Sequence, residues 1–171
     1  NLARRLVGLG AEVSIFILSG ENKKNILDIE DKIKIVEGDL TKRGDVEEVI
    51  KDKDYLFHFA WQTDLKKSMA NPLEDLKTDC VGSVNILECC KENNPDIKIV
   101  FASTVTVVGD VARIPCNEDA RENPLSVYEI HKLLGEKYFQ IYYKTYGLKT
   151  CVLRLSNVFG EGQRIDNPNR G

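Results

Sequence analysis

Tyr128 and Lys132, which lie four residues apart, are the side chains of this sequence best suited to acid/base chemistry. They stand at the start of segment 126–146, whose apolar residues recur at helical spacing. Because side chains at i and i+4 of a helix lie above one another, the phenol and the ammonium should share one face. A neighbouring ammonium favours the ionised phenol and lowers the pKa of a tyrosine toward neutral pH. The same spacing also arises by chance on ordinary helices, so the pair needs support from the elements around it.

The rest of this predicted helix has one apolar side that should pack against a core. Its residues recur at spacings of three and four: Leu133, Leu134, Tyr138, Ile141 and Tyr142. The pattern leaves Glu136, Lys137 and Lys144 for water. His131 falls away from the Tyr128 side of the helix, which favours a surface or packing role for it.

Composition and charge limit what this helix can serve. The sequence has 171 residues, 42% hydrophobic and 30% charged, which predicts one globular domain over residues 1–171. A net charge of −3 gives no broad basic field, so we expect neither nucleic acid nor a membrane as a partner. There is no apolar run of about 18 residues and no signal peptide, which favours a soluble protein.

The five cysteines are odd in number and irregular in spacing: Cys80, Cys89, Cys90, Cys116 and Cys151. They form no C-x-x-C motif, and the two histidines, His58 and His131, do not cluster with them in the sequence. We therefore expect reduced thiols in the cytoplasm, with no disulfide framework and no metal site. The adjacent Cys89 and Cys90 are most simply residues that pack one helix against its neighbours.

Short apolar strands alternate with helical patterns along the chain, which is typical of βαβ units and a parallel sheet. The predicted strands are 12–18, 32–37, 54–61, 97–103 and 150–156, the first of them buried. The other predicted helices are 1–10, 45–51 and 72–92, the last opened by Asn71-Pro72. Together these elements predict an α/β fold of the Rossmann type, a doubly wound parallel sheet.

An open parallel sheet binds its ligand beyond the carboxyl ends of its strands. Four parts of the sequence fall at such ends: Asp39, 59–61, 103–106 and Asn157. A predicted ligand site at the same edge supports the acid/base interpretation of Tyr128 and Lys132.

Six motifs, each weak alone, occur in an order and spacing that are specific when taken together. They are Gly38-Asp39-Leu40 after a strand, FHFA at 57–60, Asn71-Pro72, FASTVTVVGD at 101–110, Tyr128-x-x-x-Lys132 and LRLSNVFG at 153–160. Over essentially its whole length the chain resembles the extended short-chain dehydrogenase/reductases, in particular the nucleotide-sugar epimerases and dehydratases.

The resemblance implies roles for individual residues. Tyr128 would be the catalytic acid/base, Lys132 would lower its pKa and contact the nicotinamide ribose, and Thr104 would bond the reacting sugar oxygen. The implied cofactor-binding residues are Asp39 and Leu40 at the adenine, Phe59, Ala60 and Trp61 along the cofactor trough, and Ser103, Tyr128 and Lys132 near the nicotinamide. Asn157 would approach the substrate diphosphate.

Simpler structural roles for several of these residues also fit the sequence. Thr104 could cap the end of its strand, and Asp39 could be an ordinary turn aspartate. Trp61 and Phe59 could belong to the core, and Asn157 could be a turn residue.

Departures from the family pattern leave the cofactor open. The first predicted strand ends in Ile17-Leu18-Ser19, without the acidic residue that usually accepts the ribose 2′-hydroxyl of NAD. With Ser19 and Lys23-Lys24 nearby, NADP is an alternative to NAD. The sequence holds no glycine-rich phosphate loop, so we expect an apolar strand and such a loop before Asn1, and a substrate-recognising region after Gly171.

The favoured function is an NAD-dependent epimerase that oxidises a nucleotide sugar transiently to a keto sugar. An NAD(P)-dependent reductase of a sugar or small carbonyl, and a nonenzymatic dinucleotide-binding sensor or interaction module, are the alternatives. Dehydratases of the family have Asp-Glu directly after the catalytic Thr, where this chain has Val105 and Thr106. Asp79 stands where the family usually has Asn, and this departure puts the fine positioning of the site in doubt but not the class of protein. The resemblance also implies a homodimer built on helices 72–92 and 126–146.

Overall fold

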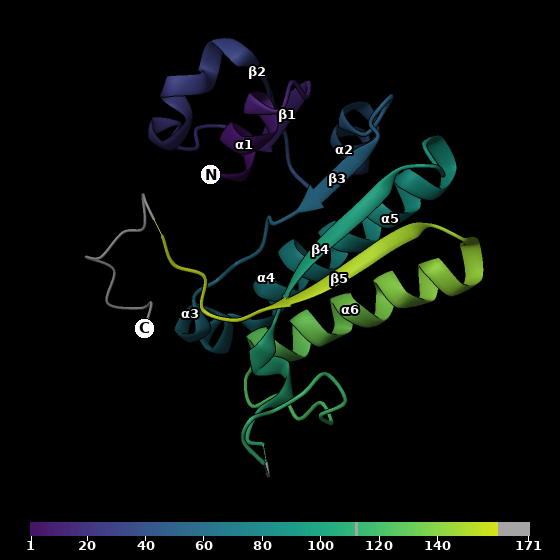
Figure 1. The fold of residues 1–171 in the computed structure, drawn as a ribbon. Coiled ribbons are helices and arrows are strands. Elements are labelled where there is room, and N and C mark those ends of the chain that lie inside the picture. The colour runs from purple at the N-terminus through teal and green to yellow at the C-terminus, as the bar shows by residue number, and fades with distance from the viewer. Residues whose placement is uncertain (112, 161–171) are drawn as a thin grey trace.

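The computed structural model describes residues 1–111 and 113–160, which form an α/β fold (Figure 1). Its strands are β1 (Val13–Ile17), β2 (Ile33–Glu37), β3 (Tyr55–His58), β4 (Lys98–Thr104) and β5 (Lys149–Leu155). Its longer helices are α1 (Leu2–Gly8), α2 (Arg43–Val49), α3 (Leu65–Ala70), α5 (Gly82–Asn93) and α6 (Val127–Tyr146). Short helical segments complete it: η1 (Lys24–Lys32), α4 (Pro72–Asp75), η2 (Leu76–Val81) and η3 (Val105–Val108). The predicted alternation of strands and helices is thereby confirmed, although β3 is shorter than expected.

All strand pairs of the described residues are parallel, and they form two sheets, β1–β2 and β3–β4–β5. In the part of the chain that the structure describes, β1 and β3 are not paired with each other (Figure 1). A Rossmann sheet has the order 3-2-1-4-5-6, so the two sheets match its two halves on either side of a central strand. The strand expected between them stays a prediction. All five residues of β1 are half-buried, so the expectation of a buried strand is wrong; one edge of β1 pairs with no strand of the described residues.

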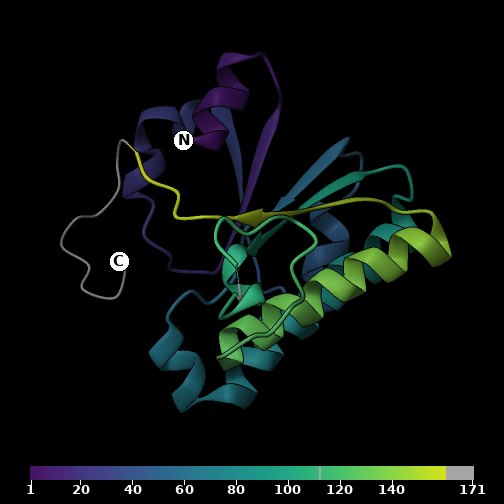
Figure 2. The same cartoon turned by 60° about the horizontal axis from the view of Figure 1, so that its bottom comes forward.

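The core lies between the three-stranded sheet and the long helices α5 and α6, which lie on one side of it (Figure 2). Residues of β4 alternate between buried and half-buried, because successive side chains point to opposite faces. Buried Ile99 and Phe101 face the helices, where Leu87 and Phe139 are also fully buried. The Phe101 and Phe139 rings stack with centroids 4.6 Å apart. The predicted packing role of Cys89 and Cys90 is confirmed, since both are fully buried in this core.

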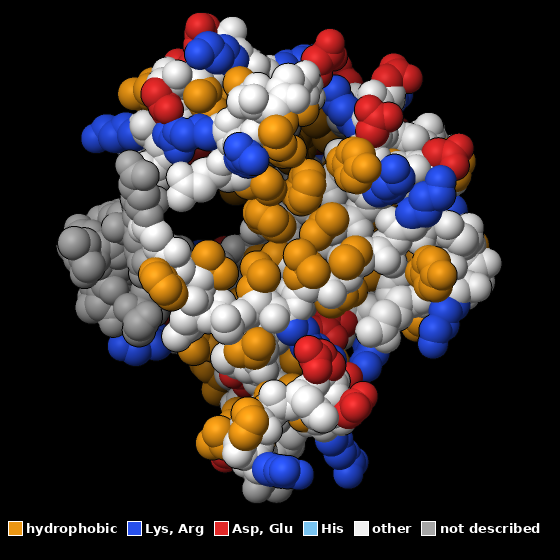
Figure 3. All heavy atoms as spheres, viewed as in Figure 1, with side chains coloured by type: hydrophobic (Ala, Val, Ile, Leu, Met, Phe, Trp, Pro, Cys, Tyr) orange, Lys and Arg blue, Asp and Glu red, His pale blue; other side chains and the backbone are white. Residues whose placement is uncertain are grey.

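The opposite face of the same sheet carries exposed apolar side chains. Phe57 of β3 and Leu153 and Leu155 of β5 are each more than a third exposed, and orange side chains gather over these strands in Figure 3. This is the face that a doubly wound fold covers with further helices. The helices of the described residues therefore hold the sheet mainly from one side.

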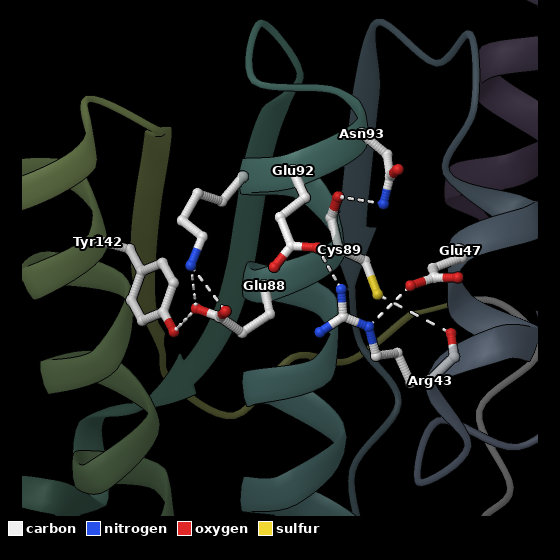
Figure 4. A network of polar contacts seen from close by, with 8 residues as sticks. Arg43, Glu47, Glu88, Cys89, Glu92, Asn93 and Tyr142 are labelled. Atoms are coloured by element: carbon white, nitrogen blue, oxygen red, sulfur yellow. Dashed lines mark hydrogen bonds and ion pairs between the residues drawn. The ribbon is translucent and has the colours of Figure 1, made fainter.

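An outer network of polar contacts fastens α5 to its two neighbours (Figure 4). Arg43 of α2 bonds both Glu47 on its own helix, at 2.7 Å, and Glu92 of α5. On the other side of α5, Glu88 accepts bonds from Lys91 and from the Tyr142 hydroxyl of α6. Tyr142 is consequently buried, as the apolar pattern predicted, and α5 and α6 form one rigid layer behind the sheet.

The predicted helix 72–92 has an interruption that its sequence pattern does not indicate. Pro72 occupies the first turn as expected, but the turns of η2, Leu76–Val81, are π-helical before α5 continues. Such π segments occur frequently at functional sites. The segments η1 and α3 were not predicted. No helix within residues 1–111 and 113–160 has the length and apolar character that a membrane crossing requires.

Candidate active site

The first turn of α6 is fixed by reciprocal capping at residues 125–129. The Ser126 hydroxyl accepts a bond from the backbone N–H of Glu129, at 3.3 Å. The Glu129 carboxylate in turn accepts from the backbone N–H of Leu125, at 2.6 Å. Because two N–H groups at the helix start are satisfied in this way, the turn that carries Tyr128 has a defined direction. Sequence spacing placed Tyr128 correctly in this first turn.

Lys132, one turn further along α6, is almost fully buried at the carboxyl half of β4. Its ammonium donates a bond of 2.6 Å to the carbonyl oxygen of Ala102. It also lies 4.1 Å from the centre of the Trp61 ring and 5.9 Å from that of Tyr128. The predicted shared face of Tyr128 and Lys132 is thus present. The cation is held by one carbonyl and by aromatic rings, with no carboxylate bonded to it.

Gly135 allows α6 to come this close to β4. A Cβ at this position would lie 2.9 Å from the Phe101 ring and 3.2 Å from the Trp61 ring. The lack of a side chain at Gly135 therefore lets α6 pack close to β4, and this close packing positions Lys132 at the strand.

The pKa of Tyr128 shifts in the direction opposite to the sequence-based expectation. Burial raises the pKa of its phenol above the ordinary value, and the negative charges of Asp79 and Glu129 raise it further. Burial also lowers the pKa of Lys132 to about 8, against the opposing effect of Asp79. The expectation failed because it counted the ammonium and left out both the loss of water and the nearby carboxyl groups.

Asp79, in the π-helical segment η2, is a buried acid with incomplete hydrogen bonding. One carboxyl oxygen accepts a bond of 3.0 Å from the backbone N–H of Gln62, and the other has no partner. Burial raises the pKa of this carboxyl to about 7, with a smaller contribution from Asp75. Asp79 is therefore partly protonated at neutral pH, which is unusual for an aspartate.

A second buried acid, Asp75, lies one turn before Asp79. Its carboxylate contacts the ring nitrogen Nδ1 of His131 at 2.7 Å and accepts a bond of 3.1 Å from the Gln62 side chain. His131 is buried by this contact, in agreement with the packing role considered for it. Gln62 bonds both acids and so links the loop after β3 to the helix that carries them.

Thr104 ends β4 at the edge of the sheet where the ligand was expected. Its hydroxyl oxygen accepts a bond from the backbone N–H of Thr106 and lies 3.0 Å from the hydroxyl of that residue. Thr104 thus caps η3, as its simpler interpretation proposed, and remains half-exposed. Two residues before it, the carbonyl of Ala102 accepts the bond from the Lys132 ammonium, so Thr104 and Lys132 lie at the same end of β4.

Ser103 faces the other side of the strand from Thr104. It is buried, and its hydroxyl donates a bond to the Glu136 carboxylate of α6. The Ser103 hydroxyl is thus engaged by α6, and the cofactor contact expected for Ser103 stays a prediction.

The prediction that Glu136 faces water is wrong, because this residue is fully buried. Arg154 of β5 bonds both of its oxygens, at 2.8 to 3.2 Å, and the same guanidinium bonds Glu122 at 2.8 Å. The helix pattern could not indicate this partner, which lies on another element.

Asp39 and Leu40 follow β2 in a tight turn. The Asp39 carboxylate accepts bonds of 2.8 Å from both the backbone N–H and the hydroxyl of Thr41. These bonds lower its pKa. Leu40 packs against the core and against Gly82 of α5. Asp39 has the turn role that was its simpler interpretation, and the turn lies at the carboxyl edge of the sheet.

The segment after β3 divides into an exposed and a packed part. Phe59 is half-exposed and Ala60 is exposed, whereas Trp61 packs against the core beside Phe101. The indole nitrogen of Trp61 is buried and has no hydrogen-bond partner. Asn157, two residues beyond β5, is exposed at the same edge. Thus the carboxyl edge brings together most of the residues predicted for a ligand site.

The chain is similar to a known protein family and to several of its members. The model of the NAD dependent epimerase/dehydratase family matches residues 1–170. The chain belongs to this family. A Methanocaldococcus jannaschii protein named as a UDP-glucose 4-epimerase is 36% identical to this chain over 152 residues. The match covers 87% of this chain and 49% of that protein.

Solved structures of epimerases have the same fold as this family member. A UDP-glucose 4-epimerase from Thermotoga maritima, solved with UDP-glucose, gives a TM-score of 0.88 at 28% identity, over 98% of this chain and 54% of that one. A UDP-N-acetylglucosamine 4-epimerase from Methanobrevibacter ruminantium, in complex with UDP-N-acetylmuramic acid, gives a TM-score of 0.84 at 32% identity. The match covers 94% of this chain and 52% of that one. The chain spans about half the length of the relatives it matches. The predicted Rossmann-type fold is confirmed.

Sequence reasoning missed the buried charges around Tyr128 and Lys132. Asp75 and Asp79 lie four residues apart, so their shared helical face could have been noticed. The Asp75–His131 contact spans 56 residues, and no local pattern indicates it. Within the described ranges, no three potential ligand side chains are grouped closely enough to hold a metal ion.

Proposed function

We propose that the protein is an NAD-dependent epimerase of a nucleotide sugar. The observation that carries this proposal is the position of Lys132, beside the Tyr128 ring and bonded to Ala102, at the end of β4 where Thr104 lies, in a chain of the epimerase/dehydratase family. The epimerase relatives named above support the substrate class.

The residues at this edge fit a nicotinamide dinucleotide. The Trp61 indole N–H and one Asp79 oxygen are buried polar groups with no hydrogen-bond partner among the described residues, and Phe59, two residues before Trp61, offers an exposed aromatic face. Lys132 and Trp61 would hold the nicotinamide end, and the turn at Asp39 and Leu40 the adenine end. When bound, NAD supplies an acceptor for the hydride that leaves the sugar carbon.

Tyr128 moves the proton in this proposal. In its ionised form, Tyr128 would accept the proton of the sugar hydroxyl on Oη while the hydride of that carbon leaves for the cofactor, and would return the proton when the carbon is reduced. Thr104 donates its hydroxyl hydrogen to the reacting sugar oxygen and so keeps it in reach of Tyr128. In this proposal the Lys132 ammonium stabilises the ionised phenol. A protonated Asp79 helps as well, because it removes a negative charge that raises the Tyr128 pKa.

The residues after Thr104 favour epimerisation over dehydration within this family. Val105 has no acid/base group, and the Thr106 hydroxyl lies against that of Thr104. Removal of water from a sugar needs a further acid and base at neighbouring carbons, and neither position supplies a carboxyl. The reductase and sensor alternatives have no observation of their own in their favour.

The test uses the whole protein with NAD⁺ and UDP-glucose as the first substrate. We expect UDP-galactose to form, measured by anion-exchange chromatography and NMR, and Asn157→Ala to raise KM more than it lowers kcat. A 4-keto-6-deoxy product would instead assign the protein to the dehydratases. Absence of any product from a panel of UDP- and dTDP-sugars, with NAD bound, would favour the sensor alternative.

We further propose a homodimer that buries the outer faces of α5 and α6. Exposed apolar side chains on α6 support it: Ile130, Ile141, Tyr143 and Tyr146 are each more than half exposed. Tyr142, the neighbour of Ile141 and Tyr143 in the chain, is buried against α5 and does not contribute. Light scattering of the whole protein should give twice the chain mass, and Ile141→Glu should convert it to the monomer.

A further inference from the structure

A three-residue polar cluster lies at the carboxyl end of β1. The Glu37 carboxylate accepts a bond of 3.0 Å from the Ser19 hydroxyl and a bond of 2.9 Å from the Lys23 ammonium. Ser19 follows β1 by two residues, and Glu37 is the last residue of β2. All three side chains reach solvent, so another molecule can approach the cluster.

The position of this cluster matters because of how doubly wound folds bind dinucleotides. An acidic residue at the end of the strand that β1 represents usually accepts the adenosine ribose 2′-hydroxyl of NAD, whereas a nearby cation accommodates the 2′-phosphate of NADP. In this chain β1 ends in Ile17, Leu18 and Ser19, which offer no carboxylate. The residue that normally distinguishes the two cofactors is therefore absent from its own strand.

Strand pairing supplies a carboxylate from the neighbouring strand. In the parallel register of β1 and β2, Glu37 lies opposite Ile17, and the next residue, Gly38, donates a backbone bond of 2.9 Å to the Ile17 carbonyl. Both strands consequently end together. The Glu37 side chain extends from this end toward Ser19, next to the position that the missing acid would occupy.

The charges of this corner are already balanced. The bond from Lys23, with a further contribution from Ser19, lowers the pKa of Glu37, so its carboxylate is ionised at neutral pH. The Lys23 charge is in turn engaged by Glu37. Arg4, the cation that α1 directs toward η1, is bonded to Asp28 and to the carbonyl of Asn25. A 2′-phosphate would therefore meet an ionised carboxylate, with Lys23 engaged by that carboxylate and Arg4 by Asp28 and the Asn25 carbonyl.

We infer that Glu37 is a specificity-determining residue that selects NAD over NADP, with Ser19 orienting its carboxylate. This inference rests on the proposed function only in that the protein binds a nicotinamide dinucleotide. Glu37 accepts the ribose 2′-hydroxyl of NAD and repels the 2′-phosphate of NADP. The choice between NAD and NADP that the sequence left open is thereby decided by a residue of β2.

Isothermal titration calorimetry of the whole protein with NAD⁺ and with NADP⁺ tests the inference without relying on turnover. Wild type should bind NAD⁺ more tightly. Glu37→Gln removes the negative charge and frees Lys23, so the ratio of the two Kd values should shift toward NADP⁺ by about tenfold or more. The double variant Glu37→Gln/Lys23→Gln should lose the gain in NADP⁺ binding, because no cation is freed.

Asp28→Asn is the control, since it removes another exposed acid, on η1, that pairs with a cation, Arg4 of α1. Its ratio of Kd values should change by less than about twofold, the scale of a remote surface charge. An unchanged ratio in Glu37→Gln would overturn the inference and leave the proposed function standing. A wild type that prefers NADP⁺ would overturn the inference and also the choice of NAD in the proposed function, but not the epimerase reaction. A wild type that binds neither nucleotide would overturn both.

Discussion

Two buried charges on α6, Lys132 and Glu136, lie one helical turn apart but have different surroundings. Glu136 is bonded by the Arg154 guanidinium on both carboxylate oxygens and by the Ser103 hydroxyl. The Lys132 ammonium donates to one carbonyl and lies against aromatic rings. Asp79, the acid with the largest electrostatic effect on the Lys132 pKa, has one carboxyl oxygen with no hydrogen-bond partner among the described residues.

The difference distinguishes a charge that stabilises the fold from a charge that is suited to proton exchange. A buried ion pair with all its hydrogen bonds made holds elements in place, and here it joins α6, β4 and β5. A buried charge with few partners has a shifted pKa, and such groups occur where protons are exchanged. The pKa values of Lys132, about 8, and of Asp79, about 7, lie near physiological pH. We therefore assign the chemistry to the Lys132 turn and the support to the Glu136 turn.

Removing Arg154 should have the largest effect on stability. Arg154→Met leaves the Glu136 carboxylate buried without its counter-charge, which should lower the free energy of unfolding by about 3 kcal/mol. Urea denaturation measures it. Lys137→Met is the control, because Lys137 pairs with Glu122 at the surface and should matter by less than about 1 kcal/mol. Equal losses in the two variants would contradict the structural role of the Glu136 turn.

Asp79→Asn should change how stability depends on pH. Because the folded pKa of Asp79 is raised to about 7, the folded state keeps a proton that the unfolded chain has already released. Stability contributed by that proton is present at low pH and lost as pH rises through about 7. Between pH 5 and pH 8 the wild type should lose about 2 kcal/mol more than Asp79→Asn, measured by urea denaturation at both values. Parallel pH curves would show that Asp79 ionises normally.

Gly135→Ala should have a smaller effect, because two terms oppose each other. Alanine favours the helix by about 1 kcal/mol, but its Cβ would lie 2.9 Å from the Phe101 ring, and overpacking costs about 2 kcal/mol. We expect a net loss of about 1 kcal/mol. Gly44→Ala on α2, where a Cβ meets nothing within 4 Å, should instead stabilise the protein. A stabilised Gly135→Ala would mean that α6 has room to move from the sheet.

The sequence was sufficient to predict the five strands and the long helices, but not η1, α3 or the π-helical turns of η2. Helical spacing placed Tyr128 and Lys132 on one face, and the strand pattern placed Thr104 at the end of β4, because both depend on residues close in the chain. The surroundings of the pair depend on distant partners. His131 meets Asp75 across 56 residues, and Glu136 meets Arg154 across 18.

Those distant partners explain the two main errors of the sequence-based account. Glu136 was assigned to water because a helix pattern contains no information about β5. The Tyr128 pKa was expected to fall because the sequence shows a lysine four residues away but does not show burial. In both cases tertiary contacts decided the state of an ionisable group.

Turnover of Tyr128→Phe in the whole protein tests the central claim most directly. The variant removes only the phenolic oxygen, so the free energy of unfolding and the Kd of NAD⁺ should stay close to those of wild type. Epimerase kcat should fall by about 10²-fold or more, the usual scale for a positioned acid/base. An unchanged kcat would contradict the assignment of the proton transfer to Tyr128.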